Sequence, residues 1–272
     1  MSETATMTNA KRATWMAPVT FRRVLRAEAI KLSTLPSFVW AFVLAYALLG
    51  GFGLLTAIAR IMQRDAATPT LSAGAGTALT GVQGAQLVII LLTAVFATTE
   101  FAHQTVQPSY LAEPRRLRVL ASKAVLVGGL SLLVGAAGAT TALLTAAVVS
   151  RSAGLPFEVE GPYAVQLVVG SAVYLAAIGV TGLAIGALLR STVGAIITGL
   201  VLLNVLPLLL GAAPFEGIRD AAGYLPSTAG LMILQEHVPA GLVEPWFGVC
   251  IAVAWAGVLL VTAALVTRRT DA

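Results

Sequence analysis

Residues 161–189 read GPYAVQLVVGSAVYLAAIGVTGLAIGALL and contain no Asp, Glu, Lys or Arg. A helix needs about 20 residues to cross the hydrocarbon core of a bilayer, and one charged residue at its centre costs about 3 kcal/mol. This segment is therefore predicted to be a transmembrane helix. Five further uncharged runs are long enough to cross: 32–59, 66–99, 124–150, 191–215 and 245–267.

Six membrane spans follow from these runs, at about 37–59, 80–101, 124–149, 163–189, 192–212 and 246–267. A seventh uncharged run, 221–235, contains Gly223 and Pro226 and is too short to span the membrane. It is predicted to form either a loop helix or a re-entrant segment.

The composition supports an all-α membrane protein. Of the 272 residues, 58% are hydrophobic and only 11% are charged, whereas about a quarter of the residues in a soluble domain are charged. These values exclude a disordered chain and an ordinary cytosolic enzyme. The single cysteine, Cys250, excludes a disulfide framework and a cysteine-based metal site.

The distribution of charge predicts the orientation of the spans. With six spans, the side that holds both termini carries 13 of the 17 Lys and Arg residues and 5 of the 12 acidic residues. An excess of Lys and Arg marks the cytoplasmic side, so both termini are predicted to be cytoplasmic. Arg60 and Arg64 depart from this pattern. The net charge of +5 is thus a topology signal and does not indicate a nucleic-acid partner.

The first cytoplasmic element is predicted at 18–33, after a disordered tail at 1–17. Its apolar residues fall on one helical stripe, and Arg22, Arg23 and Arg26 fall elsewhere, as in a helix that lies in the membrane interface. Such a helix either anchors the chain to anionic lipid or has a mechanical role. Glu28 lies on the apolar stripe, where Lys31 can pair with it. Residues 18–272 are predicted to form one transmembrane domain with an extracellular loop at 213–245.

The second cytoplasmic element is the connection EFAHQTVQPSYLAEPRRLRVLASK, residues 100–123. Pro108 and Pro114 interrupt it, so a short helix is expected at about 103–112. Glu100 ends the second span, where the helix dipole disfavours a negative charge. It is therefore expected to have a cationic partner, and the candidates are His103, Arg118 and Lys123.

The central parts of the six predicted spans contain no Asp, Glu, Lys, Arg or His, which argues against an ion-coupled transporter. Four uncharged polar residues remain as candidates for lining a pathway or for hydrogen bonding between helices: Gln83, Gln86, Thr93 and Asn204. Small residues recur every four positions, as at Gly182 and Gly186, and allow close helix contacts. The chain lacks HExxH, GxSxG and GxxxxGK[ST] motifs. We therefore expect no enzyme activity, metal or cofactor in this chain.

The order of these elements resembles that of the permease subunits of ABC-2-type ABC exporters. An interfacial Arg-x-Glu-x-x-Lys pattern comes first, and an acidic residue, a Thr, a Leu, a Pro-Arg-Arg cluster and a Lys follow the second span. Gln104 departs from the family, in which Gly is common at this position. The residues that carry the resemblance are Arg26, Glu28, Lys31, Glu100, Thr105, Leu111, Pro114, Arg115, Arg116, Lys123 and the segment Tyr224-Leu225-Pro226-Ser227.

The resemblance implies a multi-pass protein of the bacterial plasma membrane that works as a dimer, with a homodimer favoured. Two separate ABC-type ATP-binding subunits would hold ATP and Mg²⁺, and a coupling helix between spans two and three would dock onto them. The implied docking residues are His103, Gln104, Thr105, Val106, Tyr110, Leu111, Arg115 and Arg116, and the implied gating or ion-pair residues are Glu100, Lys123, Glu28 and Lys31. A non-transporting membrane scaffold and a channel or facilitator are the alternatives.

Overall fold

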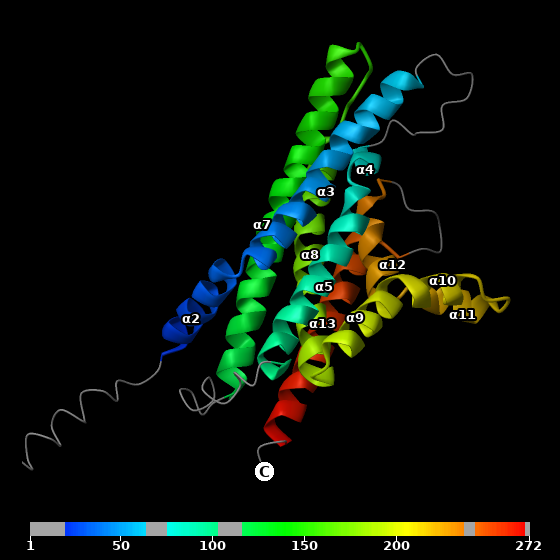
Figure 1. Ribbon diagram of the computed structural model, residues 1–272. Coiled ribbons are helices and arrows are strands. Elements are labelled where there is room, and N and C mark those ends of the chain that lie inside the picture. The colour runs from blue at the N-terminus through cyan, green and yellow to red at the C-terminus, as the bar shows by residue number, and fades with distance from the viewer. Residues whose placement is uncertain (1–19, 64–74, 103–115, 237–242, 270–272) are drawn as a thin grey trace, which may run out of the picture.

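The computed structural model describes residues 20–63, 75–102, 116–236 and 243–269 (Figure 1). Within these ranges the chain forms helices and no strand. Six of the described helical segments are long and apolar enough to cross a membrane, which confirms the predicted spans: Pro36–Met62, Ala75–Thr99, Leu117–Ser152, Gly161–Leu189, Thr192–Gly211 and Pro245–Arg268.

The boundaries of the helices differ from the predicted spans in ways that the local sequence explains. Helix α3, Pro36–Met62, begins with a proline in its first turn, where a missing N–H costs nothing. The second span starts with the short helix α4, Ala75–Ala78, and continues as α5, Gly81–Ala102. Helix α7, Arg116–Ser152, has 37 residues and is therefore longer than a bilayer requires.

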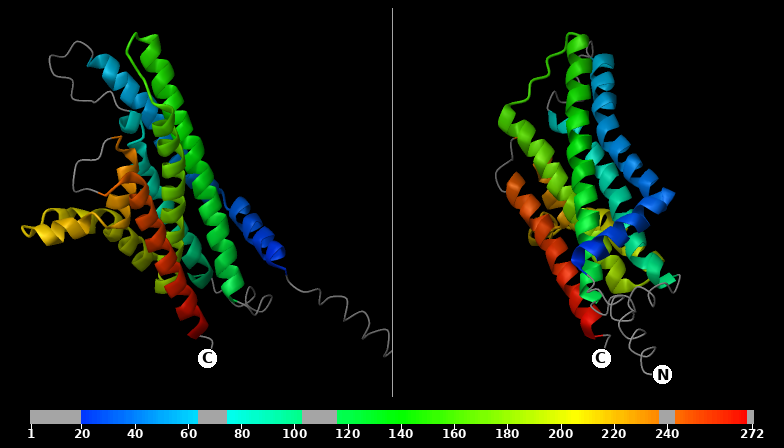
Figure 2. Two further views of the ribbon diagram at one scale, coloured as in Figure 1. Left: turned by 180° about the vertical axis from the view of Figure 1, so that it is seen from behind. Right: turned by 90° about the vertical axis from the view of Figure 1, so that its left-hand side faces the viewer.

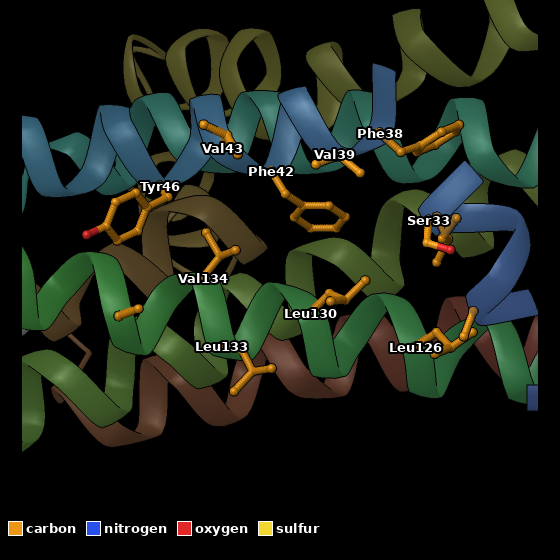
Figure 3. A pocket seen from close by; sticks show the side chains of 13 residues that line it. Ser33, Phe38, Val39, Phe42, Val43, Tyr46, Leu126, Leu130, Leu133 and Val134 are labelled. Carbon is orange, nitrogen blue, oxygen red and sulfur yellow. The ribbon is translucent and has the colours of Figure 1, made fainter. Parts of the chain in front are cut away.

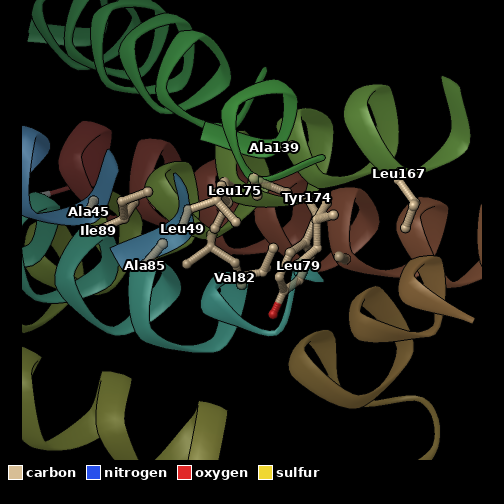
Figure 4. Packing of buried hydrophobic residues seen from close by; sticks show 14 of the residues in the cluster. Ala45, Leu49, Leu79, Val82, Ala85, Ile89, Ala139, Leu167, Tyr174 and Leu175 are labelled. Atoms are coloured by element: carbon tan, nitrogen blue, oxygen red, sulfur yellow. The ribbon is translucent and has the colours of Figure 1, made fainter. Parts of the chain in front are cut away.

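The centre of the bundle is α8, Gly161–Leu189. Its side chains pack against α5, α7 and α13, Pro245–Arg269. Figure 4 shows Tyr174 and Leu175 of α8 among Leu49 of α3 and Val82 of α5 in the apolar core. Glycines bring the backbones together: a Cβ on Gly135 of α7 would lie 2.7 Å from the Cα of Ala172 on α8. The predicted close contacts between small residues are present.

One end of the bundle collects the segments that were predicted to be cytoplasmic. The start of α7, the end of α5, the end of α13 and the helix α2, Phe21–Thr34, all lie at this end in Figures 1 and 2. The turn between α8 and α9, Thr192–Leu200, lies there too. The segments predicted to be cytoplasmic thus lie at one end of the bundle, and the compartment that this end faces stays a prediction.

The first half of the fifth span, α9, packs against α8 and α5, as the short turn at 190–192 predicts, whereas the second half leaves the bundle. Arg190 ends α8 in the left-handed conformation, with φ of 52°, and the Ser191 hydroxyl caps α9 by accepting from the Gly194 N–H at 3.3 Å. A π-helical segment, Val201–Val205, then precedes α10, Leu206–Gly211. Pro207 in α10 has no N–H to donate into the preceding turn. The helix therefore changes its hydrogen-bond register here, and α10 turns sideways from the bundle (Figure 1).

The chain then returns to the bundle through α11, Glu216–Ala222, α12, Pro226–Leu231, and the short 3₁₀ helix Met232–Leu234. Helix α12 is buried against α13 and α8, and a Cβ on Gly230 would collide with the ring of Tyr174. The indole N–H of Trp255 donates to the Tyr224 carbonyl oxygen at 3.1 Å. The uncharged run 221–235 thus forms short helices that pack against the bundle, and both predicted alternatives, a loop helix and a re-entrant segment, stay open.

Candidate functional site

Helix α2, which is predicted to lie in the membrane interface, covers Phe21–Thr34, close to the predicted 18–33. Its buried residues are Val24, Glu28 and Leu32, which lie four residues apart on one face. This face packs against α7 and, at its C-terminal end, against α3. Phe21 is exposed, so the buried stripe is narrower than the sequence predicts. A carboxylate therefore stands in the middle of the buried face of an amphipathic helix.

Glu28 is only 3% exposed and contacts two ammonium groups. Lys31, one turn further along α2, donates to the Glu28 Oε1 at 2.8 Å, as the sequence predicts. On the other side, the Nζ of Lys123 in α7 lies 3.1 Å from the Glu28 Oε2. The Lys31 side chain is 41% exposed, whereas that of Lys123 is 6% exposed. The carboxylate thus joins one cation at the surface to one cation in the interior.

Aromatic rings extend this contact into the bundle. The Lys123 Nζ lies 4.2 Å from the centroid of the Phe96 ring in α5, a cation–π distance. Phe96 in turn meets Phe38 of α3 edge to face, with ring centroids 5.4 Å apart. We call Glu28, Lys31, Lys123, Phe96 and Phe38 the Glu28 cluster. It brings the ends of α2, α3, α5 and α7 together.

Burial decides how strongly the Glu28 cluster holds these helices. A charge removed from water is destabilising by several kcal/mol unless an opposite charge and polar groups compensate it. If either partner is removed, the other stays buried as an unpaired charge. The resulting loss of stability is larger than the stabilisation that an ion pair at the surface provides. The buried contact between Glu28 and Lys123 makes the position of α2 on α7 energetically specific.

The sequence predicts the Glu28–Lys31 pair but not the contact of Glu28 with Lys123. Two signals point toward it: a carboxylate on an apolar stripe and a lysine directly before an uncharged run. The expected partners of Glu100 are not tested. Glu100 lies in the last turns of α5 and Arg116 starts α7, but their side chains lie outside the described residues. The other predicted docking residues, His103, Gln104, Thr105, Val106, Tyr110, Leu111 and Arg115, also lie outside them.

The four candidate pathway residues occupy different environments. Gln86 is buried in α5 and accepts a hydrogen bond from the hydroxyl of Tyr174 in α8. Thr93 is buried and donates to the Ile90 carbonyl oxygen of its own helix at 3.2 Å. Asn204 is exposed in the fifth span. Gln86 therefore joins two helices, which is one of the two predicted roles.

Gln83 lines a cavity of about 550 Å³ with both polar and apolar walls, at the end of the bundle away from α2. The wall includes Tyr163, whose hydroxyl donates to the Leu234 carbonyl oxygen at 2.6 Å. Thr80 and Gln235 also line this cavity. Of the four candidates, Gln83 alone is among the residues that line this cavity.

Neither the family models nor the curated proteins with which the chain was compared give a significant match. Within the part of the chain that the structure describes, no group of three or more His, Cys, Asp or Glu side chains is placed to hold a metal ion.

Proposed function

We propose that this chain is the transmembrane permease subunit of an ATP-driven ABC-2-type exporter in a bacterial plasma membrane. It forms the translocation pathway together with a second permease copy, in a homodimer. Two separate ATP-binding subunits hold ATP and Mg²⁺ and supply the energy.

The observation that carries this proposal is the ion pair between Glu28 and Lys123. Glu28 belongs to the Arg-x-Glu-x-x-Lys pattern of α2, and Lys123 ends the pattern that follows the second span. These two patterns carry most of the resemblance to exporter permeases, and they are far apart in the sequence. Their meeting in one buried contact supports the view that they belong to one mechanical unit.

The Glu28 cluster can transmit a displacement of the coupling segment to the helices that it connects. The expected coupling segment, 103–112, leads from the end of α5 to the start of α7. Phe96 of α5 and Lys123 of α7 both contact neighbours in the Glu28 cluster. A displacement of the docked segment by an ATP-binding subunit would therefore shift α5 and α7 together, and α2 would follow because Glu28 is held by Lys123.

The chain needs such an external source of energy if it transports a substrate against a gradient. Its sequence has no P-loop motif, and the centres of its predicted spans carry no Asp, Glu or His side chain that could couple transport to an ion. A scaffold would use the same segment to recruit another protein, and a channel would need no ATP-binding subunit.

Substitutions in the connection test the proposal. We expect Glu100→Ala, and separately the double substitution Thr105→Ala with Leu111→Ala, to release the ATP-binding subunit or to uncouple ATP hydrolysis from transport. Insertion into the membrane should be unchanged. Glu216→Ala is a suitable control, since Glu216 is an exposed carboxylate in α11.

The measurements are co-purification of the ATP-binding subunit and ATP-dependent transport in proteoliposomes. Wild-type assembly and transport in both variants would contradict the coupling role of this segment. Cysteine labelling of positions 113–118 from outside the cell would contradict the predicted orientation, and with it the exporter. Transport that persists without any ATP-binding subunit would instead identify a channel or facilitator.

A further inference from the structure

An apolar groove of about 550 Å³ lies between α3 and α7 on the surface of the bundle, next to α2. Figure 3 shows Phe42 and Val43 of α3 on one side of the groove and Leu130 and Val134 of α7 on the other. Its volume falls in the range of about 300–1,000 Å³ that is typical of small-ligand sites. The groove is large enough to hold a defined ligand.

The helices are in contact at one end of the groove and are separated along it. At Gly53 of α3 there is no room for a side chain, since a Cβ would overlap the backbone of Ala142 in α7. Nearer to α2, the Tyr46 hydroxyl and the Thr141 Oγ1 lie 3.0 Å apart and close the groove with a hydrogen bond. Beyond Tyr46, apolar side chains line an open space between the helices.

The length of the groove matches one leaflet of a bilayer. Its lining runs from Phe38 to Tyr46 on α3 and from Leu126 to Ala137 on α7. At a rise of 1.5 Å per residue these segments are roughly 12–17 Å long, about half of the ~30 Å hydrocarbon core. Because α3 begins at Pro36, the groove extends from the membrane interface to about the bilayer centre.

The groove offers carbon surface and few free polar atoms. The Tyr46 hydroxyl is engaged with Thr141, and the Ser33 hydroxyl at the rim donates to the Ile30 carbonyl oxygen at 2.9 Å. An occupant that needs hydrogen bonds, such as a polar substrate or a peptide backbone, would therefore lose its hydration without replacement. An acyl chain has no such requirement.

The rim of the groove is basic. Ala29 and Ser33 of α2 line the groove, and at 100° per residue Arg22 and Arg26 fall within about 60° of them on the same helical stripe. Both arginines are exposed. Arg23 points about 100° away from Arg22. Two guanidinium groups thus follow the groove toward the aqueous side, where a lipid phosphate would lie.

From these features we infer that the groove is a binding site for one anionic phospholipid of the leaflet that faces α2. One acyl chain fills the space between Phe42 and Val134, and the headgroup phosphate lies against Arg22 and Arg26. Arginine suits this role because its planar guanidinium binds phosphate oxygens in a bidentate manner. The site requires only that the chain spans a membrane, so it does not depend on the proposed transport function.

Photo-crosslinking in nanodiscs tests this site on the full chain. The nanodiscs contain phosphatidylcholine with a small fraction of phosphatidylglycerol that carries a photoactivatable group in the middle of one acyl chain. We expect label to concentrate on groove residues of α3 and α7, and unlabelled phosphatidylglycerol to compete better than phosphatidylcholine.

Two pairs of variants make the test specific. Val43→Trp fills the groove and should lower its labelling roughly tenfold, the factor for a loss of about 1.4 kcal/mol. Val148→Trp, at an exposed α7 position outside the groove lining, is the control and should leave it unchanged. Arg26→Gln should lower the preference for phosphatidylglycerol roughly fivefold, the factor for about 1 kcal/mol from one basic residue near an anionic surface. Arg23→Gln should lower the preference for phosphatidylglycerol less than Arg26→Gln does.

Three results would overturn the inference. Label spread evenly over exposed apolar positions, including Val258 of α13, would mean that lipid only surrounds the protein. Cross-links from groove residues to protein would mean that another segment or a second copy covers the groove. Equal losses of the preference for phosphatidylglycerol in Arg26→Gln and Arg23→Gln would contradict the proposed headgroup position. Both arginines are exposed, so this comparison remains valid even if Val43→Trp disturbs folding.

Discussion

Replacement of Glu28 by methionine removes the carboxylate that holds α2 on α7. Breaking a buried ion pair by removal of one partner is destabilising by about 3–5 kcal/mol. We expect about 3 kcal/mol for Glu28→Met, the low end of this range, because the Phe96 ring still contacts the Lys123 ammonium group. Lys123→Met should cost only about 2 kcal/mol, since Lys31 still donates to Glu28.

The double substitution Glu28→Met with Lys123→Met distinguishes a buried pair from two independent contacts. Replacing both members of a buried pair by apolar residues of similar size costs less than the sum of the two single changes, because no buried charge is left unpaired. We expect the double variant to be about 2 kcal/mol less stable than wild type, instead of the ~5 kcal/mol of two independent changes. The coupling energy is thus about 3 kcal/mol.

Unfolding by sodium dodecyl sulfate in mixed micelles, followed by circular dichroism, measures these free energies. The pair Glu216 and Arg219 in α11 is the control, because its side chains are 90% and 50% exposed and its nearest charged atoms are 3.9 Å apart. Its coupling energy should stay below about 0.5 kcal/mol. A coupling energy that small for Glu28 and Lys123, or a double variant less stable than both single variants, would refute the account of the Glu28 cluster.

Two further predictions concern the packing of the bundle. Gly53→Ala should lower stability by about 2–3 kcal/mol, because the new Cβ meets the backbone of Ala142. Gly51→Ala, with nothing within 4 Å of its Cβ, should raise stability by about 0.5 kcal/mol, and thermal unfolding in detergent compares the two. Tyr174→Phe should cost about 1–3 kcal/mol by leaving the buried Gln86 oxygen without its donor. Adding Gln86→Leu should recover most of that loss, and no recovery would argue against a hydrogen bond as the cause.

The features that were correctly predicted depend on local sequence. Each predicted span is a long uncharged run of mostly apolar residues. Exposing such a run to water is so unfavourable that a membrane span can be predicted from its length and composition alone. The pair of Glu28 and Lys31 is also local, because residues three apart on a helix are neighbours. The helix at 18–33 follows from the spacing of its apolar residues.

The features that were not predicted depend on contacts between distant segments. Lys123 contacts Glu28 only because α2 packs against α7. The two residues are far apart in the sequence, so no helical spacing predicts their contact. The fifth span has the apolar run of an ordinary crossing, yet it changes register before Pro207, and its second half leaves the bundle. Residues 221–235 lie against the bundle through contacts with Tyr174 and Trp255, which their own sequence does not reveal.

The composition of the complex purified from the membranes of the organism that encodes this chain tests the central claim most directly. An affinity-tagged copy is extracted in mild detergent, its partners are identified by mass spectrometry, and subunits are counted by native mass spectrometry. The account predicts two copies of this chain with two copies of a P-loop ATP-binding subunit, in a complex that hydrolyses ATP. Stable complexes that contain this chain and no ATP-binding subunit would contradict it.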